Sequence, residues 1–144
     1  MNRASNKEFD ITRRYFPFSC IDLVVVVKKG VLLTKRRETP YKGLWHLPGG
    51  IVHKGETFLQ KIDEVALREI GCKIVVTAFV GVYQNIHPYR HDISHCYIAK
   101  LRNESVVVLN RYAKVFEQIP SKTIPYHKLL IREALHQMKR HKSA

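Results

Sequence analysis

The sequence has no long apolar run. Its longest uncharged apolar stretch is Leu23–Val27, whereas a membrane-spanning helix needs roughly 20 such residues. The N-terminal sequence MNRASNKEFD carries charge with no apolar segment behind it, which argues against a secretory signal. We therefore expect no membrane contact and a cytoplasmic location. The length of 144 residues fits one domain spanning residues 1–144.

Cysteines are few. Cys20, Cys72 and Cys96 are odd in number, and their spacing does not suit a zinc site. A disulfide framework and a structural zinc are thereby disfavoured. We expect free thiols in a reducing compartment.

Acidic residues are scarce relative to basic ones. The chain has 25 Lys and Arg against 12 Asp and Glu, a formal net charge of +13. A field of this sign attracts phosphates, nucleotides or RNA without distinguishing among them. The charge is equally consistent with solubility alone. Part of it belongs to a basic C-terminal tail that we expect from about Lys139.

Patterns typical of strands outnumber those typical of helices. The expected strands are Ser19–Lys28, Val31–Arg36, Gly43–Leu47, Cys72–Gln84 (one long or two short), Ile93–Leu101, Val106–Leu109 and Val115–Phe116. The expected helices are Lys7–Tyr15, Thr57–Ile70 and Pro125–Lys139. Because one helix falls between strands, we predict an α/β (α+β) fold in which a mixed sheet lies between helices.

The middle helix has one residue out of pattern. At helical spacing one face is apolar and is formed by Phe58, Leu59, Ile62, Val65, Ala66 and Ile70. Lys61, Glu64 and Arg68 fall on the opposite face, where Glu64 and Arg68 can form an i,i+4 ion pair. Glu69 falls among the apolar residues. A buried carboxylate needs compensation, which a basic partner, a raised pKa or a metal ion could provide.

The residues before this helix favour a metal. The turn at Pro48-Gly49-Gly50 permits backbone geometries that aim carbonyl oxygens or amides at a cation or a phosphate. Mg²⁺ takes oxygen ligands, usually one or two carboxylates together with substrate phosphates. The carbonyl of Gly49, the carboxylate of Glu69 and that of Glu56 could form such a set, for Mg²⁺ or Mn²⁺.

These residues resemble the signature of the Nudix hydrolases. The residues in register with it are Gly50, Glu56, Ala66, Glu69, Gly71 and Cys72, preceded by Trp45 and Leu47-Pro48-Gly49 and followed by the final helix. The resemblance implies a Nudix-type α/β/α sandwich that hydrolyses a metal-bound diphosphate. The signature is incomplete, because Glu64, Val65 and Arg68 replace an arginine and two acids. The lost acids imply impaired water activation at phosphorus.

One branch of this family, the GDP-mannose mannosyl hydrolases, lacks comparable acids and is similar to this chain at several places. The matching segments are Ser19–Asp22, Lys35-Arg36, Gly43–Trp45, Gly81–Gln84 and Ser94-His95. In that branch water attacks the anomeric carbon of the sugar. Two departures are Ile51, in place of an arginine, and Asn110-Arg111, in place of a glutamine ligand and a histidine base. Asn110 could still offer a metal its amide oxygen, but Arg111 cannot act as a base.

Four other residues have both a structural and a functional interpretation. Asp22, in an apolar strand, needs either a structural hydrogen bond or a role in substrate binding. Arg36 can clamp a diphosphate or lie at the surface. Trp45 and His95 can bind substrate, but the pattern favours a packed core residue for Trp45 and a hydrogen-bonded, partly buried residue for His95.

Two functions remain open from the sequence. The first is a Mg²⁺-dependent hydrolase with Glu69 and Glu56 as catalytic residues, acting on a nucleoside diphosphate linked to another moiety, such as a nucleotide sugar. The second is a Nudix-fold module that binds a nucleotide or RNA without turnover. The sequence leaves a homodimer open.

Overall fold

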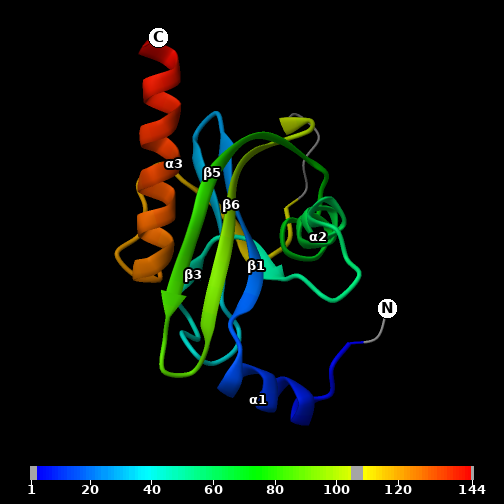
Figure 1. Ribbon diagram of the computed structural model, residues 1–144. Coiled ribbons are helices and arrows are strands. Elements are labelled where there is room, and N and C mark those ends of the chain that lie inside the picture. The colour runs from blue at the N-terminus through cyan, green and yellow to red at the C-terminus, as the bar shows by residue number, and fades with distance from the viewer. Residues whose placement is uncertain (1–2, 105–108, 144) are drawn as a thin grey trace.

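The computed structural model describes residues 3–104 and 109–143. A twisted sheet forms the middle layer, with α2 on one face and α3 on the other, and α1 lies at the end of the sheet (Figure 1). The predicted α/β fold with a mixed sheet between helices is thereby confirmed.

The helices are α1 Asn6–Tyr15, α2 Phe58–Val65, the π-helical η1 Ala66–Ile70 and α3 Pro125–Ser143. The strands are β1 Phe18–Val27, β2 Gly30–Lys35, β3 Trp45–His46, β4 Gly49–Ile51, β5 Ile74–Ile86, β6 His91–Leu101 and β7 Ala113–Phe116. The strand expected at Val106–Leu109 falls largely on residues 105–108, which lie outside the described part.

The sheet has the strand order β3-β2-β1-β6-β5, with β4 also pairing with β1 and β7 with β2. The central pair β1 and β6 is parallel, and the other pairs are antiparallel. The register of β1 and β4 sets Asp22 opposite Gly49 and Ile21 opposite Gly50. Pairing with β1 thus brings the Gly49-Gly50 segment against the middle of the sheet. The turn predicted at Pro48-Gly49-Gly50 is wrong for the two glycines, which pair with β1 as strand β4. The name glycine turn is used below for Gly49-Gly50 only.

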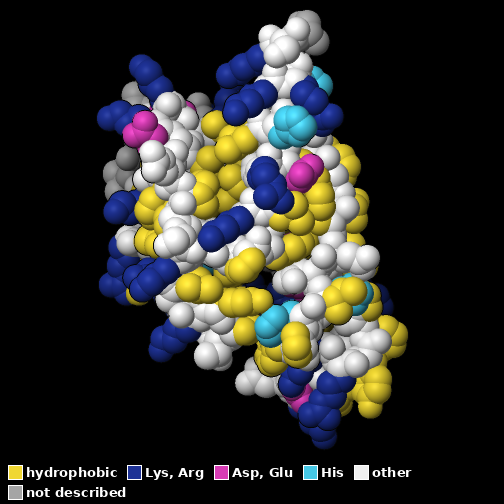
Figure 2. Space-filling view, turned by 90° about the vertical axis from the view of Figure 1, so that its left-hand side faces the viewer, with side chains coloured by type: hydrophobic (Ala, Val, Ile, Leu, Met, Phe, Trp, Pro, Cys, Tyr) yellow, Lys and Arg dark blue, Asp and Glu magenta, His cyan; other side chains and the backbone are white. Residues whose placement is uncertain are grey.

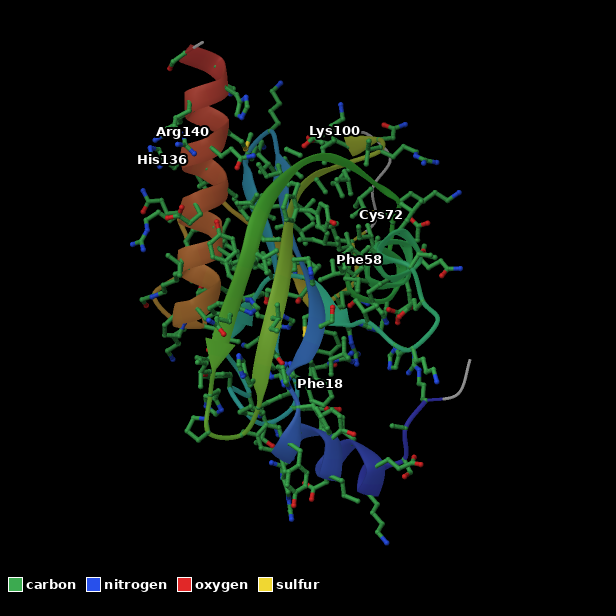
Figure 3. All side chains as sticks on the ribbon, in the orientation of Figure 1. Phe18, Phe58, Cys72, Lys100, His136 and Arg140 are labelled. Atoms are coloured by element: carbon green, nitrogen blue, oxygen red, sulfur yellow. The ribbon has the colours of Figure 1, made fainter. Side chains whose placement is uncertain are left out.

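Each face of the sheet has its own apolar core, because successive residues of a strand point to opposite faces. Ile21, Leu23 and Val25 of β1 pack with α2 and η1, whereas Val24 packs with Leu130 and other residues of α3. Figure 3 shows side chains filling the space on both sides of the sheet.

The face of α2 differs from the prediction at three positions. Lys61, expected in solvent, is 1% exposed. Leu59 and Phe58, expected in the core, are 65% and 37% exposed. The stem of Lys61 packs over the glycine turn, where a Cβ on Gly50 would lie 3.4 Å from its Cδ. Carboxylates beside its ammonium group make this burial tolerable. The pattern of apolar residues in a sequence shows neither the packing of the Lys61 stem on Gly50 nor the pairing of its ammonium group with carboxylates.

The end of the middle helix also differs. The predicted single helix becomes π-helical at Ala66, and the amide of Gly71 donates to the carbonyl of Ala66, five residues earlier. Gly71 ends the helix as predicted, in the left-handed conformation (φ 89°) that favours glycine. The π turn changes the directions in which Arg68 and Glu69 project from those of a regular α-helix.

At the C-terminus α3 continues to Ser143, four residues beyond the predicted end of the helix at Lys139 and through the residues expected as a basic tail. The predicted free thiols are confirmed for Cys20, Cys72 and Cys96. Among the described residues, the helices fall short of the length and apolarity that crossing a membrane requires.

Candidate functional site

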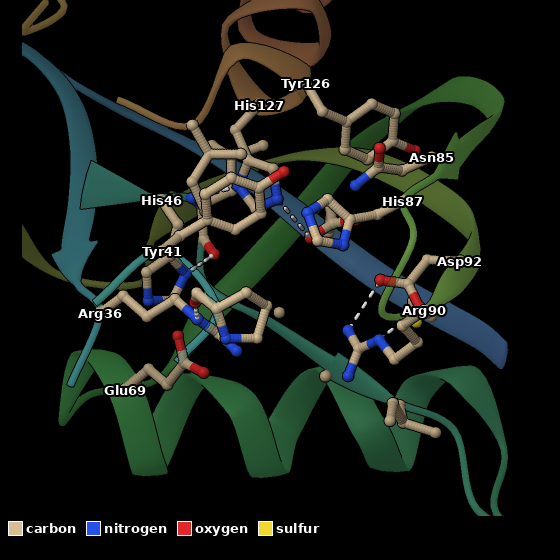
Figure 4. A pocket seen from close by; sticks show the side chains of 18 of the residues that line it. Arg36, Tyr41, His46, Glu69, Asn85, His87, Arg90, Asp92, Tyr126 and His127 are labelled. Atoms are coloured by element: carbon tan, nitrogen blue, oxygen red, sulfur yellow. Dashed lines mark hydrogen bonds and ion pairs between the residues drawn. The ribbon is translucent and has the colours of Figure 1, made fainter. Parts of the chain in front are cut away.

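A cavity of about 380 Å³ opens beside the glycine turn. It lies between η1 on one side and the connection from β5 to β6 on the other, with the start of α3 at the top of the view in Figure 4. Four of the predicted site residues line it: Asp22, Arg36, Gly49 and Glu69. Residues far apart in the sequence are thereby brought into one place.

The lining of this cavity is predominantly basic. Its Lys and Arg residues are Arg3, Arg36, Lys61, Arg68 and Arg90, and its acids are Asp22, Glu69 and Asp92. Lys and Arg also predominate over Asp and Glu on the molecular face shown in Figure 2. A concave surface of this sign favours an anionic ligand.

Asp22 is a buried carboxyl group at the edge of the cavity. Burial raises its pKa from an ordinary value of 3.8 to about 7. Its Oδ1 lies 4.0 Å from Nε2 of His127, which comes from the first turn of α3. Near neutral pH this carboxyl group is therefore poised to take up or release a proton.

The close approach of Asp22 explains why position 49 is a glycine. A Cβ on Gly49 would lie 2.5 Å from the Oδ1 of Asp22 and 2.5 Å from the carbonyl oxygen of Ile21. The absence of a side chain is thus a steric requirement of the β1–β4 pairing, whatever the carbonyl of Gly49 binds.

Two neutral histidines, His46 and His127, also line the cavity. Nδ1 of His127 accepts a hydrogen bond from the amide of Leu47 at 2.8 Å, so the proton of its neutral ring is on Nε2, which faces Asp22. Burial lowers the pKa of His127 to about 3. Burial also lowers the pKa of His46, whose Nε2 lies 3.0 Å from the hydroxyl of Thr34. Neither histidine was predicted as a site residue, because each lies in a segment whose local pattern gives it no unusual position.

Arg36 is held at one edge of its guanidinium group. Its Nε donates to the carbonyl of Pro40, and no described residue accepts a hydrogen bond from its two terminal nitrogens. The side chain is half-buried and lies above Glu69 in Figure 4. These nitrogens are in the fork geometry that suits a phosphate group.

A second arginine on the far side of the cavity was not predicted. Arg90 forms a two-point ion pair with Asp92, at 2.7 Å from Nε to Oδ1 and 2.7 Å from Nη2 to Oδ2. Asp92 pairs in the sheet with Phe18 at the start of β1. Only the tertiary pairing of β6 with β1 signals that these residues belong to the site.

Glu69 already has partners in the protein. Its Oε2 accepts a hydrogen bond from the hydroxyl of Thr34 at 3.2 Å, and its Oε1 lies 3.2 Å from Nη2 of Arg68. The same nitrogen donates to the carbonyl oxygen of Gly49 at 3.2 Å. Of the three forms of compensation left open for Glu69, the structure contains the basic partner.

Glu56 is partnered as well and does not line the cavity. Its Oε2 accepts a hydrogen bond from the amide of His53 at 2.9 Å and lies 3.3 Å from Nζ of Lys61. Nζ of Lys61 also lies 3.1 Å from Oε2 of Glu64. The predicted pair of Glu64 with Arg68 is confirmed.

The expected Mg²⁺ or Mn²⁺ ligands were Gly49, Glu69, Glu56 and Asn110, and in this arrangement they do not fit a metal ion. Arg68 bridges the first two, Lys61 holds Glu56, and the Oδ1 of Asn110 accepts a hydrogen bond from the amide of Tyr112 at 3.0 Å. The described residues contain no cluster of three or more His, Cys, Asp or Glu side chains suited to a metal.

Trp45 and His95 lie away from the cavity. Trp45 packs edge-on against Phe116, with ring centroids 4.7 Å apart. His95 packs on Phe58 of α2 at 4.5 Å, and its Nδ1 lies 3.1 Å from the carbonyl oxygen of Cys20. Both positions suit the structural interpretation of these residues.

Comparison with known proteins adds independent findings. A family model described as "NUDIX domain" matches residues 18–138. The chain is 31% identical over 85 residues to the low-salt glycan biosynthesis protein Agl8 of Haloferax volcanii, covering 59% of this chain and 54% of that protein. It is 33% identical over 84 residues to an ADP-ribose pyrophosphatase of Methanocaldococcus jannaschii, covering 57% and 50%. The chain therefore spans about half the length of these curated relatives.

Solved structures show the same fold at lower identity. A NUDIX hydrolase from Nitrosomonas europaea superposes with a TM-score of 0.70 at 14% identity, covering 84% of this chain and 90% of that one. The NUDIX domain of Shewanella oneidensis NrtR, complexed with ADP ribose, superposes with a TM-score of 0.65 at 19% identity, covering 94% and 99%. Since the family model extends from β1 through the glycine turn and α2 into α3, the chain belongs to the NUDIX domain family.

Proposed function

We propose that this chain binds a nucleoside diphosphate linked to another moiety, such as a nucleotide sugar, and hydrolyses the linkage. The observation that carries the proposal is the cavity itself. It brings the unengaged end of Arg36 and the raised-pKa carboxyl group of Asp22 to one basic concave surface. The guanidinium group of Arg36 can bind the phosphates, and the carboxyl group of Asp22 can activate a water molecule.

The names of relatives support the substrate class. One relative is an ADP-ribose pyrophosphatase, and the NrtR domain of similar fold was solved with ADP ribose. Agl8 belongs to glycan biosynthesis. ADP ribose is a nucleoside diphosphate joined to a sugar, and glycan biosynthesis is sugar chemistry, so this substrate class fits all three names.

In the proposed reaction, Arg36 and Arg90 bind phosphate oxygens, and Glu69 orients Arg68 beside them. The ionised carboxylate of Asp22 takes a proton from water. The oxygen of that water bonds to the carbon or phosphorus at the linkage. The bond from that atom to a phosphate oxygen breaks, and the electron pair stays on the departing phosphate group, where the arginines stabilise the charge. No step is assigned to a metal ion, because its expected ligands are held by Arg68 and Lys61.

A binding module without turnover is the second candidate. The replacement of two signature acids by Val65 and Arg68 favours it. Both candidates use the same basic cavity, so binding alone does not separate them.

Turnover tests the proposal. The purified chain is incubated with ADP-ribose, ADP-glucose and GDP-mannose, and the released nucleotide is measured by chromatography. We expect release from at least one substrate and its loss, by about 100-fold or more, in Asp22→Asn, because an amide cannot accept the proton. The matched control is Asp63→Asn, at an exposed position of α2. Tight binding with no release from any substrate would support the binding module instead.

A further inference from the structure

Arg68 lies where the family signature places an acid. Its Nη1 pairs with Oε1 of Glu64, and its Nη2 contacts both Oε1 of Glu69 and the carbonyl oxygen of Gly49. A Cβ on Gly50 would lie 3.2 Å from this Nη2, so the guanidinium group lies directly on the glycine turn. One side-chain cation thus occupies the place between the two oxygens that were expected to ligate a metal.

Lys61 supplies a second cation on the same side. Its side chain is 2% exposed, and its ammonium group contacts the carboxylates of Glu56 and Glu64. If this ammonium group left its position, the carboxylates of Glu56 and Glu64 would repel each other. Each glutamate of the signature that this chain retains is therefore paired with a basic side chain: Glu56 with Lys61 and Glu69 with Arg68.

These contacts oppose a divalent cation. Mg²⁺ needs several oxygen ligands at close to 2 Å in an octahedral arrangement. Here the oxygens of Gly49, Glu69 and Glu56 already accept from, or pair with, Arg68 or Lys61. Arg68 cannot give up its proton, so a metal could enter only if the side chain left Gly49 and Glu69. The ion would then also lie close to Lys61.

The same contacts suit a phosphate. Arg68 lines the cavity, and its side chain is 41% exposed, so a ligand in the cavity can reach it. Glu64, Glu69 and the Gly49 carbonyl hold the group in one orientation. Three of the five N–H groups of this guanidinium make these contacts, and the remaining two, on Nε and on Nη1, can donate to phosphate oxygens.

We infer that Arg68, supported by Lys61, takes the place of the divalent metal, so that a nucleoside diphosphate binds this chain without Mg²⁺. The inference rests on the proposed function for its ligand class. The inference gives Arg68 a role in ligand binding. The sequence pattern did not indicate this role, because it placed Arg68 on the solvent side of the helix.

Binding of ADP tests the inference directly. ADP is titrated into the full chain by calorimetry, once with EDTA and once with MgCl₂. We expect dissociation constants that differ by less than about threefold, because the protein supplies the positive charge. In EDTA, Arg68→Gln should weaken binding by about tenfold or more. Arg132→Gln, which removes the same charge from an exposed position of α3, should leave binding unchanged.

Metal binding gives a readout that does not depend on the nucleotide. The spectrum of free Mn²⁺ is followed by electron paramagnetic resonance while the chain is added. The wild-type chain should leave the spectrum unchanged. Arg68→Glu, which restores an acid of the signature, should gain Mn²⁺ binding. If that variant does not fold, the wild-type titration alone decides.

The possible failures can be told apart. ADP binding that requires Mg²⁺, or one Mn²⁺ bound per wild-type chain and lost in Glu69→Gln, overturns the inference and leaves the proposed function standing. Absence of ADP binding in both buffers overturns the proposed ligand class, and the inference with it.

Discussion

At the scale of single residues, the site is defined by charges whose partners lie far away in the sequence. Asp22 is an isolated acid in an apolar strand, and only the tertiary structure shows that Gly49 and His127 approach it. Its burial, rather than a neighbouring charge, is the main cause of its raised pKa. Its chemistry therefore depends on the cavity remaining partly closed to water.

The raised pKa of Asp22 predicts a pH-dependent effect on stability. Between about pH 4 and about pH 7 its carboxyl group is ionised in the unfolded chain and protonated in the folded one, so this group's contribution to stability is lost as pH rises. Asp22→Asn lacks that loss. Its free energy of unfolding relative to wild type should rise by about 1 kcal/mol or more from about pH 5 to about pH 7.5.

Urea unfolding followed by the fluorescence of Trp45, the single tryptophan, measures this difference. His127, with its lowered pKa, contributes in the opposite direction, but it is present in both proteins and cancels when they are compared. A difference that stays constant across the pH range would contradict the assignment.

At the scale of elements, the segment from α2 to Gly71 controls the site. α2 begins at a capping box, in which the hydroxyl of Thr57 accepts from the amide of Gln60 and the side chain of Gln60 accepts from the amide of Thr57. The π turn at its end then aims Arg68 and Glu69 at the glycine turn. A regular helix over the same residues would project these neighbouring side chains about 100° apart.

The cap predicts a measurable effect on the same element. Thr57→Ala should lower the free energy of unfolding by about 1 kcal/mol, because one amide of the first turn loses its partner. Thr57→Ser keeps the hydroxyl and should change stability by no more than a few tenths of a kcal/mol. Thermal unfolding of the three proteins in parallel makes the comparison. Equal losses in both variants would assign the effect to the methyl group instead.

At the scale of the whole molecule, the net charge of +13 surrounds a cavity that is itself basic. Both features attract an anionic ligand, but they respond differently to salt. Charges spread over the surface are screened beyond roughly 10 Å at moderate ionic strength, whereas partly buried contacts are screened much less.

Salt therefore separates the two contributions. Between about 50 mM and about 300 mM NaCl, the association rate of ADP should fall severalfold as long-range attraction is screened, while the dissociation rate should change little. Stopped-flow fluorescence measures both rates. Replacing Arg140 and Lys142 in the last turn of α3 by Gln should reduce the salt dependence of the association rate without changing the dissociation rate. A dissociation rate that rises as steeply as the association rate falls would mean that the bound phosphates lie in solvent.

The local sequence by itself determined most of the elements, because apolar periodicity and turn residues reflect forces acting within a few residues. It also singled out Asp22, Gly49 and Glu69, since an acid in an apolar pattern and a pair of glycines each violate a local rule, whereas Arg36 stayed open between a surface position and a phosphate contact. The tertiary structure alone decided what these residues meet. The burial of Lys61 over Gly50, the placing of Arg90 and His127, and the bridge from Arg68 to Gly49 all depend on strand pairing and on one π turn. Such contacts join residues that no local pattern connects, and they determine whether a carboxylate faces a metal or an arginine.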